Sequence, residues 1–312
     1  FRRLVVTPKG RAQISRFVTE WIGSDNILEK VAAANFTSSI KSAMLTETER
    51  FVEHVIFFGT GTLAELFNAK YTFVNSELAN YYQIPITDTS SAFNRVTLDS
   101  KRAGILSQGS FLGTSSVGVA LLHRGLIVRK KLLCQQLPAL ASLGFPTNFT
   151  PPALPPKMAG ETERELMTKL VPKGTACYQC HQYFMPTGYA FENFDAFGKY
   201  REIDNGAAVD PSGELVMSNV IHPVTQQVLN TSLNSTTHFS NFSQFATSVS
   251  SRQELGSCFV NKLNTFASGR QDVVANECSL LGQQIQFDSS SGNVLEAFSR
   301  FIQSSQFTQR SR

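Results

Sequence analysis

The sequence predicts a mainly α-helical protein that contains one small β-hairpin. Apolar residues recur at helical spacing in the first half of the chain and again in its last third. A stretch from 144 to 156 contains five prolines, which sustain neither a helix nor a central strand, and it separates the helical parts. Two clusters of Asp, Asn, Ser and Gly between 204 and 213 are typical of turns, and they predict the hairpin.

The expected helices follow from the spacing of apolar residues and from capping residues. In the first half we expect helices over 14–22, 37–58, 75–82, 103–112 and 121–134, with a short extended segment from Tyr71 before the third of them. A capped helix is expected near Glu161. Residues 230–251 are rich in Ser, Thr and Asn and predict a surface loop that runs into a helix, and apolar periodicity after 255 predicts further helices.

These segments predict three domains. The first is an N-terminal helical domain over 1–98, and the second spans 99–229 and includes the proline-rich linker at 144–156. The third is a C-terminal helical domain over 230–312. The chain starts at Phe1 without an initiator Met, so we expect upstream residues to have been removed or to lie outside the sequence given.

Composition and charge exclude several functional classes. Charged residues make up only 17% of the 312 residues, and uncharged polar residues take their place, which favours an exported protein. The net charge is +4, from 28 basic and 24 acidic residues spread along the chain, so nucleic-acid binding is not indicated. No segment approaches the roughly 20 apolar residues that a membrane-spanning helix needs.

The residues whose pattern indicates a chemical role are Cys177, Cys180 and His181, which form a Cys-x-x-Cys-His motif. This pattern is typical of covalent attachment of a c-type haem. Two thiols three positions apart on a helical turn each reach one vinyl group, and the adjacent imidazole then faces the iron as the proximal ligand. The sequence therefore predicts one covalent haem c with His181 bound to the metal.

Two other interpretations of the motif stay open. A Cys-x-x-Cys pair also forms half of a four-ligand zinc site, or a redox-active dithiol. Zinc requires two more ligands, and the chain has no second Cys-x-x-Cys and no close pair of His. A dithiol of the thioredoxin kind requires a strand, a turn and a helix, whereas an aromatic-rich, helical region surrounds this motif.

The remaining groups that would hold the cofactor are less defined. Candidates for the sixth iron ligand are Met217, His222, His238 and Met185, with Met217 slightly favoured because the hairpin would fold over the ring, and an open position is the further option. A carbonyl from 186–188 would orient the imidazole. Arg201 or Arg124 would meet a haem propionate, although a solvated arginine is an equally good interpretation of Arg201.

The pairing of the five cysteines also indicates the redox state of the protein's cellular compartment. Cys177 and Cys180 are assigned to the haem. Of the other three cysteines, Cys258 and Cys278 lie on neighbouring expected helices, and a turn at Gly269 would bring them together. We therefore expect a disulfide between them and an oxidising compartment, periplasmic or extracellular. Cys134 is then expected to be a single buried thiol.

The motifs together resemble the large secreted cytochrome-like proteins of planctomycetes and related bacteria, which are built from consecutive domains of unknown function. The resemblance rests on the segments 71–82, 102–109, 123–134, 177–181, 188–201, 258–260, 267–270 and 305–310. It implies export and a c-type haem but no settled activity. Met185 stands where relatives have Asp before the Pro, which keeps it among the candidate ligands. Phe1 falls inside what resembles the first domain, so the family's extra N-terminal helices are expected to be absent.

The sequence thus predicts an exported monohaem protein that transfers electrons to and from redox protein partners. One alternative is a haem enzyme with an open iron position and peroxidase-like or oxygen chemistry. The other is a structural subunit of a larger electron-transfer assembly. No catalytic triad, phosphate loop or pair of carboxylates is evident, so a carrier is favoured over a catalyst.

Overall fold

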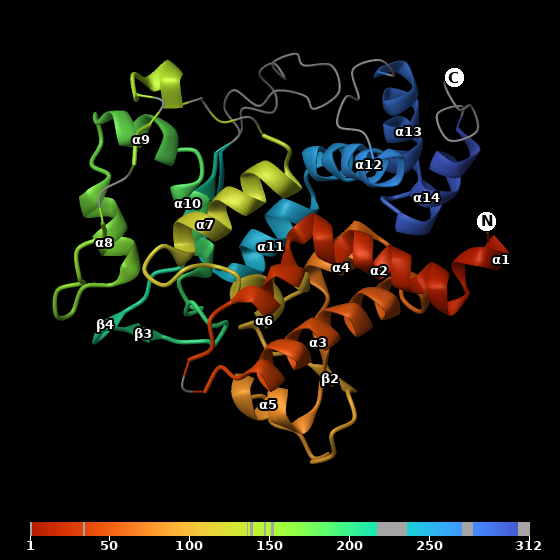
Figure 1. The fold of residues 1–312 in the computed structure, drawn as a ribbon, viewed down its shortest axis with the longest axis horizontal. Coiled ribbons are helices and arrows are strands. Elements are labelled where there is room, and N and C mark those ends of the chain that lie inside the picture. Colours follow the sequence, from red (N-terminus) through yellow and green to blue (C-terminus); the bar gives the residue numbers. More distant parts are fainter. Residues whose placement is uncertain are drawn as a thin grey trace.

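The computed structural model describes residues 2–33, 35–135, 137, 140–146, 148–150, 153–216, 236–269 and 277–304, and within these it is mainly helical, as predicted (Figure 1). The helices are α1 (Arg2–Val5), α2 (Pro8–Ile22), α3 (Ser38–Phe57), α4 (Leu63–Asn68), α5 (Ser76–Tyr82), α6 (Gly109–Leu112), α7 (Ala120–Ile127), α8 (Glu163–Leu170), α9 (Ala176–His181), α10 (Met185–Gly188), α11 (Phe242–Ser250), α12 (Gln253–Ser268), α13 (Glu277–Ser289) and α14 (Val294–Gln303). No described helix combines the length and apolarity needed to cross a membrane.

The strands form small two-stranded antiparallel sheets. The pairs are β1 (Tyr71–Val74) with β2 (Asn94–Thr97), β3 (Ile203–Asp204) with β4 (Ala207–Ala208), and β5 (Gly213–Leu215) with β6 (Thr237–Phe239). The expected hairpin near 204–213 is confirmed only in its first half, where Asn205 and Gly206 have positive φ and form the β3–β4 turn. The second half of the expected hairpin contributes β5, which pairs instead with β6, more than twenty residues further along the chain.

The N-terminal and C-terminal helices share one core. Thr7 caps α2 by accepting a hydrogen bond from the backbone N–H of Gly10, and Gly23 ends the helix at a φ of 75°. The apolar face of α2 buries Phe17 and Trp21, and the Trp21 ring lies 5.3 Å from the ring of Phe259 in α12. Packing between segments so far apart in the chain means that the two ends stabilise each other.

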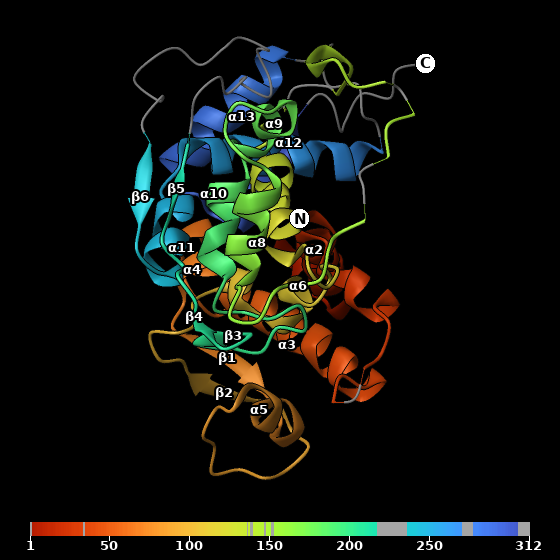
Figure 2. The same ribbon diagram turned by 90° about the vertical axis from the view of Figure 1, so that its left-hand side faces the viewer.

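A lobe made of α5, β1 and β2 lies at one end of the molecule, and α9 lies toward the other (Figures 1 and 2). A buried polar network joins this lobe to the centre. The Glu47 carboxylate in α3 accepts hydrogen bonds from Thr72 Oγ1 and Tyr82 Oη, both at 2.6 Å. The backbone N–H of Gly109 donates to Tyr82 Oη, and the Arg102 guanidinium lies 4.2 Å from the Tyr82 ring centroid.

Helices α7 and α10 cross at very close range because both carry glycine at the crossing. A Cβ added at Gly125 would lie 2.2 Å from the Phe184 carbonyl oxygen, and one added at Gly188 would lie 2.2 Å from the Leu121 carbonyl oxygen. As the chain advances from 121 to 125 in α7, its contacts retreat from 188 to 184. The two helices therefore run antiparallel, and this register determines what lies beside α9.

A disulfide joins Cys134 to Cys258, with the Cα atoms 5.3 Å apart. The expected pair Cys258–Cys278 and the expected free thiol at Cys134 are therefore wrong. The cause is tertiary: α12 packs against η3, the π-helical turn Val128–Leu132 that continues α7, so Cys258 faces the end of that turn.

Several expected helices differ in length from the observed ones. The helices over 14–22, 37–58 and 75–82 are confirmed as α2, α3 and α5, with Thr37 and Asn75 as capping residues. The helix over 103–112 is instead a short 3₁₀ turn, Ile105–Ser107, followed by α6, because Gly104 has a φ of 54° and lies against Phe67. The capped helix near Glu161 is α8, with a capping box between Thr162 and Glu165.

Candidate functional site

The Cys-x-x-Cys-His motif occupies α9, a helix of 6 residues. The chain enters it through Pro172 and through Gly174, whose φ of 88° suits glycine. Thr175 then caps the helix by accepting a hydrogen bond from the Tyr178 backbone N–H at 3.2 Å. Because residues three apart share one face of a helix, this turn presents both thiols together.

Both thiols of the motif are free and half-buried. The side chains of Cys177 and Tyr178 pack against the main hydrophobic core. Burial raises the pKa of the Cys180 thiol, while the positive charge of Lys130 acts in the opposite direction. A raised pKa disfavours the thiolate, which is the form that attacks a disulfide, so the surroundings do not activate Cys180 as a redox nucleophile.

His181 ends α9 and is also partly buried. Burial lowers the pKa of its imidazole, which favours the neutral form that binds a metal. Its Nδ1 atom is buried and has no hydrogen-bond partner, so the expected bond to a carbonyl of 186–188 is not formed in this state. The Phe184 ring lies 4.8 Å from the imidazole and borders it on one side.

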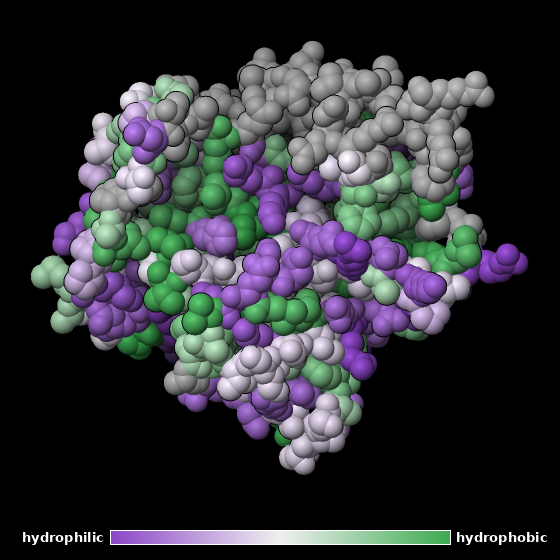
Figure 3. Space-filling view, in the orientation of Figure 1, coloured by the Kyte–Doolittle hydropathy of each residue, from purple (hydrophilic) through white to green (hydrophobic). Residues whose placement is uncertain are grey.

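These residues fit a c-type haem. Two free thiols and one neutral imidazole lie on a single helical turn, and the orphaned Nδ1 atom shows that this imidazole is not committed to a structural hydrogen bond. Hydrophobic residues also gather where α7, α8 and α9 meet on the face shown in Figure 3, as a large apolar ring requires. Zinc requires further ligands, and among the described residues no group of three or more His, Cys, Asp or Glu is arranged to hold a metal.

The candidates for a second axial ligand lie in different places. Met185 is buried in the main core at the start of α10, with only 4% of its surface exposed. His238 lies on the exposed strand β6, where its Nδ1 atom is 3.6 Å from the Glu214 carboxylate. Met217 and His222 lie outside the described residues. The choice among these ligands, or an open position, stays a prediction.

Neither predicted propionate partner lies free beside the motif. Arg201 forms an ion pair with Asp204 at 2.7 Å, and the Asp204 carboxylate also accepts a hydrogen bond from the Glu163 backbone N–H at the beginning of α8. The Cys-x-x-Cys-His motif follows the C-terminal end of α8, whereas this ion pair lies at its N-terminal end. Arg124 is fully buried and donates hydrogen bonds to the carbonyl oxygens of Leu112 and Phe194, so it holds the core together.

The structure adds neighbours that the sequence did not indicate. Arg129 and Lys130 in η3 lie close enough to Tyr183 and Cys180, respectively, for their charges to interact. The helical spacing from Gly125 to Arg129 is visible in the sequence. What the sequence does not show is that α7 runs antiparallel to α10, and this register alone brings η3 to the motif.

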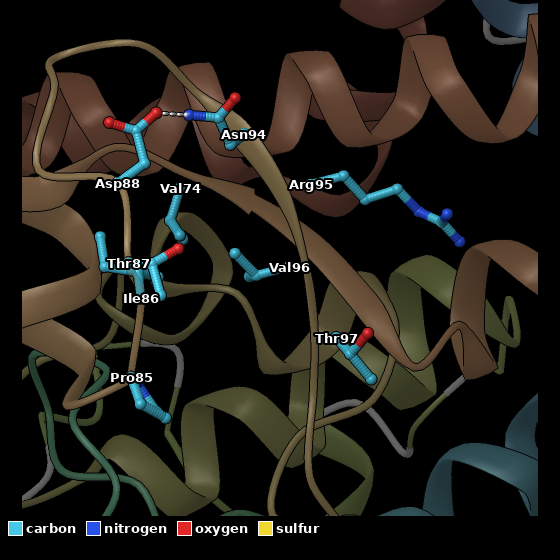
Figure 4. Close-up of a pocket in the computed structure, with 9 residues that line it drawn as sticks. All are labelled: Val74, Pro85, Ile86, Thr87, Asp88, Asn94, Arg95, Val96 and Thr97. Atoms are coloured by element: carbon cyan, nitrogen blue, oxygen red, sulfur yellow. Dashed lines mark hydrogen bonds between the residues drawn. The ribbon is translucent and has the colours of Figure 1, made fainter.

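One described cavity lies far from the motif, on the lobe of α5 and β2. Its volume is about 460 Å³, and it lies between the segment 85–88 and strand β2, with Val74 and Val96 among its apolar lining (Figure 4). Asp88 accepts a hydrogen bond from Asn94 Nδ2 at 2.6 Å across one end. The polar groups at that end are therefore satisfied by each other, and the cavity has no chemical link to α9.

Comparison with known families divides the chain into two matched segments. Residues 1–84 match PSD4, a protein of unknown function (DUF1592), and residues 102–204 match PSCyt3, a protein of unknown function (DUF1588). Both matched families are of the planctomycete type, and the name of the second, whose match spans the motif, suggests a cytochrome-like domain. No curated protein and no solved structure gives a significant match. The matched segments fall within the first and second predicted domains, whose boundaries stay a prediction.

Proposed function

We propose that this chain is an exported c-type cytochrome that carries one covalent haem and transfers electrons. The observation that carries the proposal is the pairing of two free thiols with an orphaned, neutral imidazole on one capped turn, inside the cytochrome-like segment. A haem bound there would supply reversible one-electron chemistry. The chain would contribute the attachment, the proximal ligand and the surroundings that set the potential.

Each residue of the motif has a distinct role in this proposal. Cys177 and Cys180 would form the two thioethers, and His181 would bind the iron through Nε2. Nδ1 would then carry the ring proton, and its donor strength would depend on the acceptor that it meets once the ring is fixed. The Phe184 ring, 4.8 Å away, limits the rotation of the imidazole and shields one side from water.

Export and partners belong to the same proposal. The disulfide Cys134–Cys258 supports an oxidising compartment, periplasmic or extracellular, and covalent attachment prevents loss of haem there. The partners would be other redox proteins, including members of a multi-subunit assembly. Fast electron transfer then requires only a haem edge that a partner can approach.

The test is a reduced pyridine haemochrome spectrum combined with peptide mass analysis. The full chain should be produced in a host that exports it and attaches haem c. We expect a c-type spectrum and a peptide over 174–190 whose mass includes haem. Replacement of both Cys177 and Cys180 by Ala should abolish both results, whereas the matched replacement of Cys134 and Cys258 by Ala should keep the haem. A motif peptide without haem in the unmodified chain would refute the proposal.

The optical spectrum of the same sample distinguishes a carrier from a haem enzyme. A six-coordinate, low-spin spectrum is expected for an electron carrier. A high-spin spectrum that changes when cyanide is added would indicate an open iron position and the alternative, oxygen or peroxide chemistry.

A further inference from the structure

The segments that meet at the Cys-x-x-Cys-His motif are almost free of acidic residues. The whole chain is nearly balanced, with 28 basic and 24 acidic residues. No Asp or Glu occurs between Asp99 and Glu161, a stretch that contains α7 and η3. None occurs between Glu165 and Glu192, around α9 and α10, and none follows Glu254 in α12. Because α7, α9 and α12 lie at the same end of the molecule (Figures 1 and 2), their basic residues have few acidic neighbours in the sequence.

Three lysines at this end form one cluster beside the motif. Lys130 and Lys131 are consecutive in η3, and the charge of Lys130 reaches the Cys180 thiol. Lys262 lies in α12, which packs against η3. Burial and then the charge of Lys131 lower the pKa of Lys262, so these two ammonium groups are close enough to repel each other. We call Lys130, Lys131 and Lys262 the lysine cluster.

Tertiary contacts at the backbone of Lys131 bring the cluster together. The Lys131 carbonyl oxygen accepts a hydrogen bond from Trp21 Nε1 at 2.8 Å, and the disulfide sulfur of Cys258 lies 3.1 Å from the same oxygen. Lys262 follows Cys258 by about one turn of α12. The cluster is therefore a product of the fold, because its members come from two elements that are far apart in the chain.

The lysine cluster has no anionic partner among the described residues. Elsewhere on the described surface many cations are paired with carboxylates, as Arg11 is with Glu53 at 3.0 Å. No described carboxylate forms an ion pair with Lys130, Lys131 or Lys262. Lys130 is exposed and the other two are half-buried, so all three reach solvent. Like charges that are held together repel one another, and an anionic partner would relieve that repulsion.

We infer that the lysine cluster is the docking surface for an acidic redox protein, which exchanges electrons with the haem at the edge that carries the thioethers. The inference rests on the proposed function, because it needs a haem on α9. Thioethers at Cys177 and Cys180 would hold that edge of the ring at α9, next to Lys130. Carboxylates around the redox centre of a partner would be attracted to the three ammonium groups, and this attraction would bring the two centres together in a productive orientation.

The test measures how fast a reduced plant-type ferredoxin, an acidic one-electron donor, reduces the ferric haem of the full chain. One electron passes from the iron–sulfur cluster to the haem iron, which leaves oxidised ferredoxin and ferrous haem. We expect the second-order rate constant to decrease by about tenfold or more between about 10 mM and 1 M salt. Over that range the screening length shrinks from about 30 Å to about 3 Å, so attraction between the two surfaces is lost.

Variants of the cluster assign this attraction to named residues. Lys130→Gln changes an exposed side chain and should lower the rate constant at low salt about threefold, because one attractive charge is removed. The double replacement with Lys131→Gln should lower it about tenfold, and both variants should equal the unmodified protein at 1 M salt. Lys130→Arg keeps the charge and should keep the rate constant. Lys9→Gln is the matched control, since Lys9 is exposed near the start of α2 and Trp21, at the other end, contacts η3.

A second reaction separates docking from a change in the haem itself. Hexacyanoferrate(III), an anion, takes one electron from the ferrous haem and becomes hexacyanoferrate(II). Loss of an attractive lysine should slow this oxidation as well as the reduction by ferredoxin. A lower haem potential alone would slow the reduction but speed the oxidation, so slower rates in both directions identify the attraction.

Three results would overturn the inference. The first is equal rate constants for Lys130→Gln and Lys9→Gln at low salt, and the second is opposite responses of the two reactions. The third is retention of the chain by duplex DNA that depends on the cluster, with ferredoxin rates that ignore salt, which would assign these lysines to nucleic acid. None of them affects the proposed function, since haem is attached in every sample. A chain that attaches no haem refutes the function and the inference together, and the haemochrome spectrum identifies that case before any rate is measured.

Discussion

The free energy of unfolding should decrease as the pH rises because of Glu47, and replacement of Glu47 by Gln should abolish this decrease. Glu47 is 1% exposed, and burial, the largest effect, raises the pKa of its carboxyl from 4.5 to about 7. Hydrogen bonds from Thr72 and Tyr82, together with the charge of Arg102, offset only part of the cost of burial. The folded protein therefore holds a proton at a pH where the unfolded chain has released it.

The sign and the size follow from linkage. Unfolding between about pH 4.5 and pH 7 releases this proton, so the stabilising contribution is complete below pH 4.5 and is lost as the pH rises through 7. The two pKa values of Glu47 differ by about 2.5, and each unit corresponds to about 1.36 kcal/mol, so the free energy of unfolding should fall by about 3 kcal/mol. Gln keeps the shape of the side chain and has no proton to lose, so its profile should lack this decrease.

The assay is denaturant unfolding, followed by helical circular dichroism and by the fluorescence of Trp21, at several pH values and one ionic strength. Trp21 is the single tryptophan and is 5% exposed, so its emission reports on the core. Glu53→Gln is the matched control, because Glu53 lies on the same helix and pairs with Arg11 at the surface. It should follow the unmodified protein. Equal pH slopes for Glu47→Gln and the unmodified protein would refute the reasoning.

Two more perturbations test the packing around the site. Gly125→Ala should destabilise the protein by about 1–3 kcal/mol, because the added Cβ would overlap the Phe184 carbonyl. Gly282→Ala is the matched control: this glycine has open space around it in α13, so alanine should stabilise the protein by up to about 1 kcal/mol. Thermal unfolding measures both changes, and equal effects of the two variants would contradict the close crossing of α7 and α10. Replacement of Cys134 and Cys258 by Ala should cost about 2–5 kcal/mol, because the crosslink spans 124 residues of chain. An unchanged denaturation midpoint under non-reducing conditions would mean that the disulfide does not form.

Local features of the fold were predictable from the sequence, and long-range ones were not. Thr37 and Asn75 stand directly before apolar periodicity, so α3 and α5 were located correctly. The helix over 103–112 was wrong because its start depends on Gly104, which lies against the backbone of Phe67 in another element. Strand β2 and helix α4 were missed, since one is an exposed edge strand and the other is only 6 residues long.

The candidate site shows the same contrast between local features, which were predictable, and long-range contacts, which were not. The motif on α9 is contiguous, so its residues and their common face followed from spacing alone. The cationic residues beside it come from η3, and the disulfide partner of Cys258 lies 124 residues away. No periodicity within one segment encodes such a pairing, because it depends on how α12 packs against η3. The expected propionate partner Arg201 pairs with Asp204 at the beginning of α8, and its role toward a haem stays a prediction.

The contacts around the motif also determine how the protein can be divided for experiment. In the matched segment 102–204, the backbone N–H of Gly109 donates a hydrogen bond to Tyr82 Oη of the first matched segment, and Cys134 is joined to α12 by the disulfide to Cys258. A fragment cut at 99 and 229 would expose the buried Arg102 and Arg129 and would lose that crosslink. Loss of the crosslink alone should cost about 2–5 kcal/mol, and the surfaces that pack against Tyr82 and α12 would be open to water, so such a fragment should be much less stable than the full chain. The proposed electron transfer would therefore depend on the packing of these segments against one another, and the potential of a haem on α9 should respond to substitutions in α12 that never touch the motif.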